Sequence, residues 1–357
     1  AAAAAVAAAD LGFPEDNSRV MAPRTAESWE QEESTPQKCR SCSEKLPLET
    51  NDWTPLHHAA YDGHAACVAV MIEETKGVRY GVQVLYSAVR GKTLPAEDGS
   101  LMNSQNKDGA TPLLLASAKG HVDVVRQLLA HPQINVNKSL KDGSSPIYMA
   151  ARHGHSEVVK MLLLHPSLDV NRPTRLGHTA FFVAAQEGHA RVVRQLMRHP
   201  NLPVNMQMPD GATPLYIAAQ EGHLEVVKQL MAHPQLDLNV AEENGATPLY
   251  IAAQEGHWEV VRQLMTNAEL EQNDSIDVNR AMDDGATPLY IAAQEGHWEV
   301  VRQLLEHTDI DTNTTMLNGY GENGQGETPL GVARRKGHED IIELLSGEVT
   351  TMCGFKM

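Results

Sequence analysis

Hydrophobic and polar positions repeat along most of this chain with a period of 34 residues. Five glycines follow one another at this step, and so do five histidines, after which His297 and His338 follow at steps of 40 and 41 residues and His64 precedes the first by 57. We expect one supersecondary unit repeated about eight times, with insertions at three places. The regular positions are Gly109, Gly143, Gly177, Gly211 and Gly245, and His121, His155, His189, His223 and His257.

Each unit begins with signals for a turn and a short helix. In the segment 210–239, Gly211 follows an aspartate and predicts a turn, because glycine accepts positive φ without steric cost. Thr213 can then cap exposed N–H groups, and Pro214 is favoured at the first helical position. Apolar residues continue this helix, and Gly222 is expected to end it.

A second helix is predicted after His223 in the same unit. Its apolar residues recur at helical spacing, and Pro234 is expected to stop it. Helices of about ten residues are marginal alone in water. Stacking against like neighbours is therefore needed to bury the apolar residues of each helix, which predicts an all-α solenoid.

The pattern resembles the ankyrin repeat, which has a turn, two antiparallel helices and a T-P-L-H-x-A signature. The first unit carries Thr54-Pro55-Leu56-His57, and a Gly-His pair recurs in all eight units. Later units place Leu114, Tyr216, Tyr250 and Tyr290 at the position of His57. The resemblance covers roughly residues 51–348 and implies an ankyrin-repeat solenoid of about eight helix-turn-helix units with short turn fingers.

Several segments depart from the repeat, and two of them are short insertions near 267–276 and 313–325. Residues 1–50 are rich in Glu, Ser and Pro, which predicts a mostly disordered N-terminal arm. Residues 78–104 contain a 23-residue insert, and inserts in solenoids often serve recognition. Residues 349–357 form a tail after the last predicted helix.

The charge of the chain narrows the class of partner. The formal net charge of the 357 residues is −17, which argues against nucleic acid and against an anionic membrane surface. Residues 243–313 alone hold 14 acidic and 3 basic residues. Four cysteines favour a reducing compartment, and no apolar run is long enough to cross a bilayer. We expect a cytoplasmic protein, or a subunit of an organellar complex after removal of a presequence.

Four units carry a Gln-Glu pair late in the first helix. In ankyrin proteins this place borders the concave groove, so the pairs form a stripe that can accept hydrogen bonds and salt bridges from a basic partner. The alternative is a solvated face copied by duplication. The pairs are Gln186-Glu187, Gln220-Glu221, Gln254-Glu255 and Gln294-Glu295.

Aromatic residues accompany the acidic stretch. Trp258 and Trp298 follow the repeat histidine in two successive units and could form a hot spot for a basic partner, or could pack between second helices. Tyr216, Tyr250 and Tyr290 are expected near them in the groove.

The remaining chemical patterns have simpler interpretations. Cys39, Cys42, His64 and Cys67 have zinc-like spacing, but Cys67 occupies a position that other units fill with buried valine. Histidines that precede prolines at helix ends suit the negative helix terminus, and they and the glutamates lie too far apart for a shared metal. The G-x-G-x-x-G match at 319–324 follows no strand. No catalytic, metal or cofactor site is predicted.

The sequence therefore predicts a protein-binding scaffold or adaptor, or a structural subunit of a larger complex, that takes a basic partner in its groove and on its turn tips. The alternative is a regulatory or enzyme-associated subunit whose chemistry lies in a partner or in the 78–104 insert.

Overall fold

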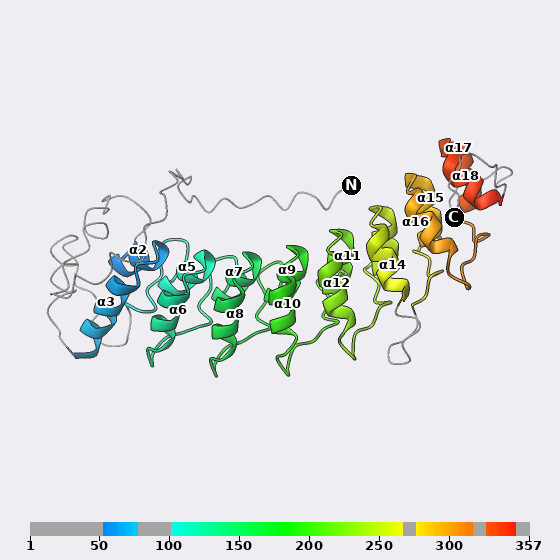
Figure 1. Cartoon of the computed structure of the whole chain (residues 1–357). Helices are drawn as coiled ribbons and strands as arrows, with labels where there is room; N and C mark the ends of the chain where they lie inside the picture. Colours follow the sequence, from blue (N-terminus) through cyan, green and yellow to red (C-terminus); the bar gives the residue numbers. More distant parts are fainter. Residues whose placement is uncertain (1–52, 78–100, 267–275, 317–325, 348–357) are drawn as a thin grey trace, which may run out of the picture. The chain divides into compact units, whose positions relative to one another are not determined.

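The structure, a computed structural model, describes residues 53–77, 101–266, 276–316 and 326–347. These residues form sixteen helices in eight pairs, and each pair is one repeat unit (Figure 1), which confirms the predicted all-α repeat fold. The first helices of units 1 to 8 are α2 (Pro55–Tyr61), α5 (Pro112–Lys119), α7 (Pro146–Arg152), α9 (Ala180–Gln186), α11 (Pro214–Gln220), α13 (Pro248–Gln254), α15 (Pro288–Glu295) and α17 (Pro329–Lys336). The second helices are α3 (Ala65–Gly77), α6 (Val122–Leu129), α8 (Ser156–Leu163), α10 (Ala190–Leu196), α12 (Leu224–Met231), α14 (Trp258–Thr266), α16 (Trp298–Leu305) and α18 (Glu339–Ser346).

The first helices begin as the sequence predicts. Thr213 is the N-cap of α11, and its hydroxyl oxygen accepts a hydrogen bond from the Tyr216 N–H at 3.1 Å. A threonine or serine caps the first helix of every unit in the same way. The helix ends two residues before Gly222, whose φ of 72° turns the chain toward α12.

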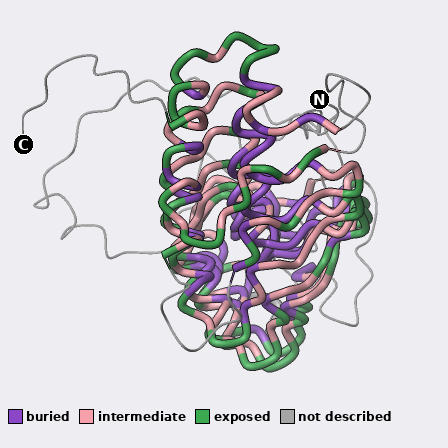
Figure 2. Tube along the Cα trace, turned by 90° about the vertical axis from the view of Figure 1, so that its right-hand side faces the viewer, coloured by how far each residue is buried: buried purple, intermediate pink, exposed green. Residues whose placement is uncertain are grey.

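The helices stack in series. Each first helix packs against the first helices of the neighbouring units, and each second helix does the same in its own row. Ala218 and Ala219 of α11 and Val226 and Val227 of α12 are fully buried, and their equivalents form the core of the other central units. Figure 2 shows buried residues through the interior of the array and exposed residues on its turns.

A histidine joins each unit to the one before it. The Nε2–H of His257 donates to the carbonyl oxygen of Gln220 at 2.9 Å, and its ring lies against Gly222. A Cβ added to Gly222 would come within 2.6 Å of that ring, so only glycine fits. The same hydrogen bond recurs at all seven junctions between units, which explains the Gly-His repeat.

Turn fingers connect each unit to the next. In unit 5 the Met208 N–H donates to the Ala212 carbonyl at 2.8 Å and closes the finger. The Glu243 N–H of unit 6 donates to the Asp210 carbonyl at 3.0 Å, which links adjacent finger tips.

The predicted arm at 1–50, the tail at 349–357 and most of the insert lie outside the described residues. Of the insert, only residues 101–104 are described, and Leu101 and Met102 among them are buried. Within the described ranges, no helix has the length and apolar character required to cross a membrane.

Candidate functional site: the Gln-Glu row

The Gln-Glu row consists of the four predicted pairs, which occupy equivalent places at the ends of α9, α11, α13 and α15. The next unit's histidine holds the carbonyl oxygen of each glutamine, as His223 does for Gln186 at 2.8 Å and His297 for Gln254 at 2.9 Å. The backbone under the row is therefore fixed by the stacking itself, and the register of the side chains is set by the repeat.

The glutamate side chains of the row face solvent. Glu187, Glu221, Glu255 and Glu295 are all exposed, whereas the glutamine before each is half-buried. The Gln254 side-chain amide donates to Glu255 at 3.1 Å and that of Gln294 donates to Glu295 at 2.9 Å, so two pairs present a carboxylate with an amide beside it. Such a surface can accept hydrogen bonds and ion pairs from cationic side chains.

The sign of the charge changes along the same repeat position. In units 2 and 3 the equivalent residues are Lys119 and His153, and Arg152 precedes the latter. Arg152 pairs loosely with Glu187, with 3.9 Å between Nε and Oε1, at the point where the basic units meet the acidic ones. In unit 8 the position returns to Lys336. In unit 1 it is the half-buried Asp62, so the exposed glutamates at this position form one continuous run in units 4 to 7.

The three tyrosines lie in the first turns of α11, α13 and α15. Tyr250 and Tyr290 are buried between first helices, and Tyr290 is only 2% exposed, whereas Tyr216 is half-buried. Burial raises the pKa of all three phenols, that of Tyr290 to about 12. Tyr250 and Tyr290 therefore expose little surface to a partner.

The two tryptophans differ in exposure. Trp258 is half-buried, and Trp298 is 42% exposed with the Arg302 guanidinium 5.8 Å from its ring centroid. Both begin second helices, on the far side of the Gly-His turn from the Gln-Glu pair of the same unit. Packing accounts for much of the Trp258 surface, while Trp298 keeps an open face.

The remaining candidates are only partly described. Cys39, Cys42 and the 319–324 glycine motif lie outside the described residues, and Cys67 is half-buried next to the fully buried Val68. In the described part of the chain, no three metal-ligating side chains gather. The histidines that precede prolines accept hydrogen bonds through Nδ1, as His233 does from the Gln235 N–H at 3.2 Å, which links each histidine to the turn after its helix.

An asparagine ladder between units was not predicted. The Asn205 side chain donates to the Gln235 carbonyl at 2.8 Å and accepts from the Asp237 N–H at 3.0 Å, which ties the loop of unit 5 to that of unit 4. Five further asparagines bond to the following loop through one or both of these contacts, and a Val-Asn or Leu-Asn dipeptide marks most of them in the sequence. They are Asn103, Asn137, Asn171, Asn239 and Asn279.

Comparison with known families agrees with this architecture. A model described as "Ankyrin repeats (3 copies)" matches residues 92–174, 163–242, 181–274, 227–316 and 270–352, and a single "Ankyrin repeat" model matches residues 51–78. Among curated proteins, no match to the chain is found.

Proposed function

Because the chain belongs to the ankyrin-repeat family, whose repeats are generally protein–protein interaction modules, we propose that it is a scaffold or adaptor that binds a basic partner protein along the Gln-Glu row. The observation that carries the proposal is the run of four exposed carboxylates, Glu187, Glu221, Glu255 and Glu295, at one repeat position in consecutive units.

The spacing of these carboxylates suits an extended basic surface. Adjacent helices pack about 8–10 Å apart, so the four glutamates span about 25–30 Å. That length matches a segment with several lysines or arginines better than a single cation. The acidic stretch 243–313 steers the partner toward the row.

A pair of charge-reversal variants tests the proposal. Glu255→Lys with Glu295→Lys alters the row, and Glu259→Lys with Glu299→Lys makes the same change of net charge on the second helices of the same units. A panel of labelled 15-residue peptides, basic, neutral and acidic, is titrated against each protein by fluorescence anisotropy.

We expect the basic peptides to bind, with a slower association rate as salt rises from about 50 to 200 mM, because the screening length falls from about 14 to 7 Å. The row variant loses this binding and the second-helix variant keeps it. Equal behaviour of the two variants would mean that the row only maintains solubility.

A further inference from the structure

The second helices carry a regular pattern of charge. In units 2 to 7 each has an exposed basic residue at the same position, and in five of these helices an acidic residue lies three positions earlier. Asp123 and Arg126 form an ion pair at 2.6 Å, and Glu157 and Lys160 form one at 3.5 Å. The basic residues are Arg126, Lys160, Arg194, Lys228, Arg262 and Arg302, and the acidic ones are Asp123, Glu157, Glu225, Glu259 and Glu299.

Helix α10 of unit 4 breaks this pattern. Arg191 stands where the other five helices have an acid, and Arg198 follows one turn after Arg194. Arg191 and Arg194 share one face of α10, about 4.5 Å apart along its axis, and Arg198 lies in the turn that follows the end of the helix at Leu196. All three are exposed, and no ion pair joins any of them to a carboxylate of the described residues.

An uncharged neighbour holds the central arginine. The Arg194 Nε–H donates to the side-chain oxygen of Gln229 on α12 at 2.7 Å, and Gln229 in turn donates to Glu225 at 3.2 Å. This chain of hydrogen bonds orders the guanidinium of Arg194 without neutralising it at close range. A partly ordered arginine loses less side-chain entropy when it binds an anion.

An exposed leucine lies beside the arginines. Leu164 directly follows α8 and has the same repeat position as Arg198, which follows α10, so the two lie just after the ends of adjacent helices that pack against each other. The side chain of Leu164 is 79% exposed, and alanine occupies this position in units 2 and 5. An apolar contact therefore borders the cationic one.

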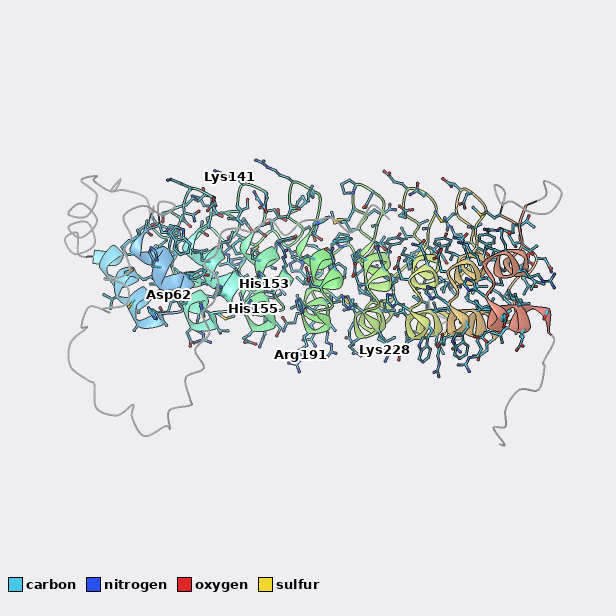
Figure 3. All side chains as sticks on the ribbon, turned by 90° about the horizontal axis from the view of Figure 1, so that it is seen from above. Asp62, Lys141, His153, His155, Arg191 and Lys228 are labelled. Atoms are coloured by element: carbon cyan, nitrogen blue, oxygen red, sulfur yellow. The ribbon has the colours of Figure 1, made fainter. Side chains whose placement is uncertain are left out.

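We propose that Arg191, Arg194, Arg198 and Leu164 form a second binding surface, for an acidic polypeptide segment that carries clustered carboxylates and an apolar side chain. In Figure 3 Arg191 and Lys228 lie on the opposite side of the ribbon from Lys141, which belongs to the turn finger of unit 3. This surface takes partners of the opposite charge to the Gln-Glu row and is independent of it.

An acidic polypeptide accounts for the three arginines better than solubility or nucleic-acid binding does. Like charges three residues apart destabilise a helix, so solubility alone gives no reason to replace the acid found in five sister helices with Arg191. A nucleic acid would extend over α12, α14 and α16, where Glu225, Glu259 and Glu299 repel it. A short acidic segment can lie along α10 and meet the arginines without crossing α14 and α16.

The test uses the full chain and a labelled 15-residue peptide with four glutamates and one leucine at helical spacing, together with the same peptide with glutamine for glutamate. Arg191→Glu recreates the acid-base pair of the sister helices, so this variant should fold at least as well as the natural protein. Arg262→Glu is the matched control, because it changes the equivalent of Arg194 two units away.

We expect the glutamate peptide to bind the natural protein and the glutamine peptide to fail. Arg191→Glu should weaken binding by about tenfold or more, Leu164→Ser should weaken it by a smaller factor, and Arg262→Glu should leave it within about twofold. Excess basic peptide should not compete, which separates this surface from the proposed function of the row. Circular dichroism melting verifies that each variant is folded.

Three results would overturn the proposal. One is an equal effect of Arg191→Glu and Arg262→Glu, which would indicate that binding depends only on the overall charge of the protein. Another is a loss of binding in Lys119→Glu with Arg152→Glu, which would place the acidic peptide at the basic end of the groove. The last is concentration-dependent dimerisation in sedimentation that Arg191→Glu abolishes, which would make a second copy of the chain the occupant.

Discussion

The His57 side chain shows how one residue of the repeat signature couples folding to pH. Its Nδ1 accepts the Thr54 N–H at 3.1 Å, and its Nε2 contacts the carbonyl oxygens of Ala110 at 3.0 Å and Ser104 at 3.1 Å. Burial lowers the pKa of His57 from 6.5 to about 4, although the two carbonyls partly oppose this. The folded protein therefore keeps this imidazole neutral.

We predict a loss of stability in unit 1 as pH falls from about 6.5 to 4. Above 6.5 the imidazole is neutral in both states and the full stability is present; below it the unfolded chain binds a proton that the folded unit resists. The total effect is about 3 kcal/mol. Hydrogen exchange of residues 54–62 at pH 7 and pH 4 measures it.

His57→Leu is the control, since Leu114 occupies the same position in unit 2. The variant should lose this part of the pH dependence in α2. An unchanged pH profile would show that other groups govern the acid sensitivity of unit 1.

At the scale of elements, the last unit is joined to the array by a buried carboxylate. Glu327, just before α17, accepts the Tyr290 hydroxyl of α15 at 3.0 Å and two N–H groups of Arg335, each at 2.8 Å. These Arg335 hydrogen bonds, helped by Tyr290 and opposed by burial, lower the pKa of Glu327. Four sister units have alanine at this position, so the contact is specific to the junction of α15 and α17.

We predict that Glu327→Ala destabilises unit 8 by about 1–3 kcal/mol, because it leaves the buried Tyr290 hydroxyl without its acceptor. Adding Tyr290→Phe should recover part of the loss, since Phe182 fills the same position in unit 4. Urea unfolding, followed by hydrogen exchange of residues 329–346, gives the loss of unfolding free energy for each of the two single variants and for the double variant. Full additivity of the two changes would contradict the described contact.

Repeat periodicity predicts these elements well and their side-chain environments less well. Thr213, Pro214 and Gly222 mark α11 within two residues, because capping and positive φ are local requirements. The burial of Tyr250 and Tyr290 was not predicted, since a first helix is covered on two flanks by neighbours that local sequence does not reveal. The local sequence does not distinguish Asn205 from an ordinary polar loop residue, because its hydrogen-bond partners lie in the following unit.

At the scale of the whole array, the helices of each described unit pack against those of the units before and after it. Val227 lies in α12, and its N–H donates to the His223 carbonyl at 3.0 Å, whereas no helical bond depends on the N–H of Val226 in the first turn. Disruption of α12 therefore removes support from the helices that pack against it, α10 and α14.

We predict that Val227→Pro abolishes hydrogen-exchange protection across α10, α12 and α14, because it breaks a helical bond and clashes with the preceding turn at a cost of about 3 kcal/mol. Val226→Pro should have a smaller effect, since proline is tolerated in a first helical turn. Loss confined to residues 210–239 would contradict nearest-neighbour coupling.

The histidine and asparagine contacts between units also determine how the array responds to tension. Each junction repeats the same few hydrogen bonds. A force applied to the two ends of the array therefore acts on a series of nearly equivalent junctions. Under force these junctions break one after another, and each 34-residue unit that unfolds releases about 11–12 nm of extended chain. Optical tweezers should record a series of nearly equal increases in extension, with a larger increase for each unit that contains an insertion. The protein would then act as an extensible tether between whatever its two ends hold.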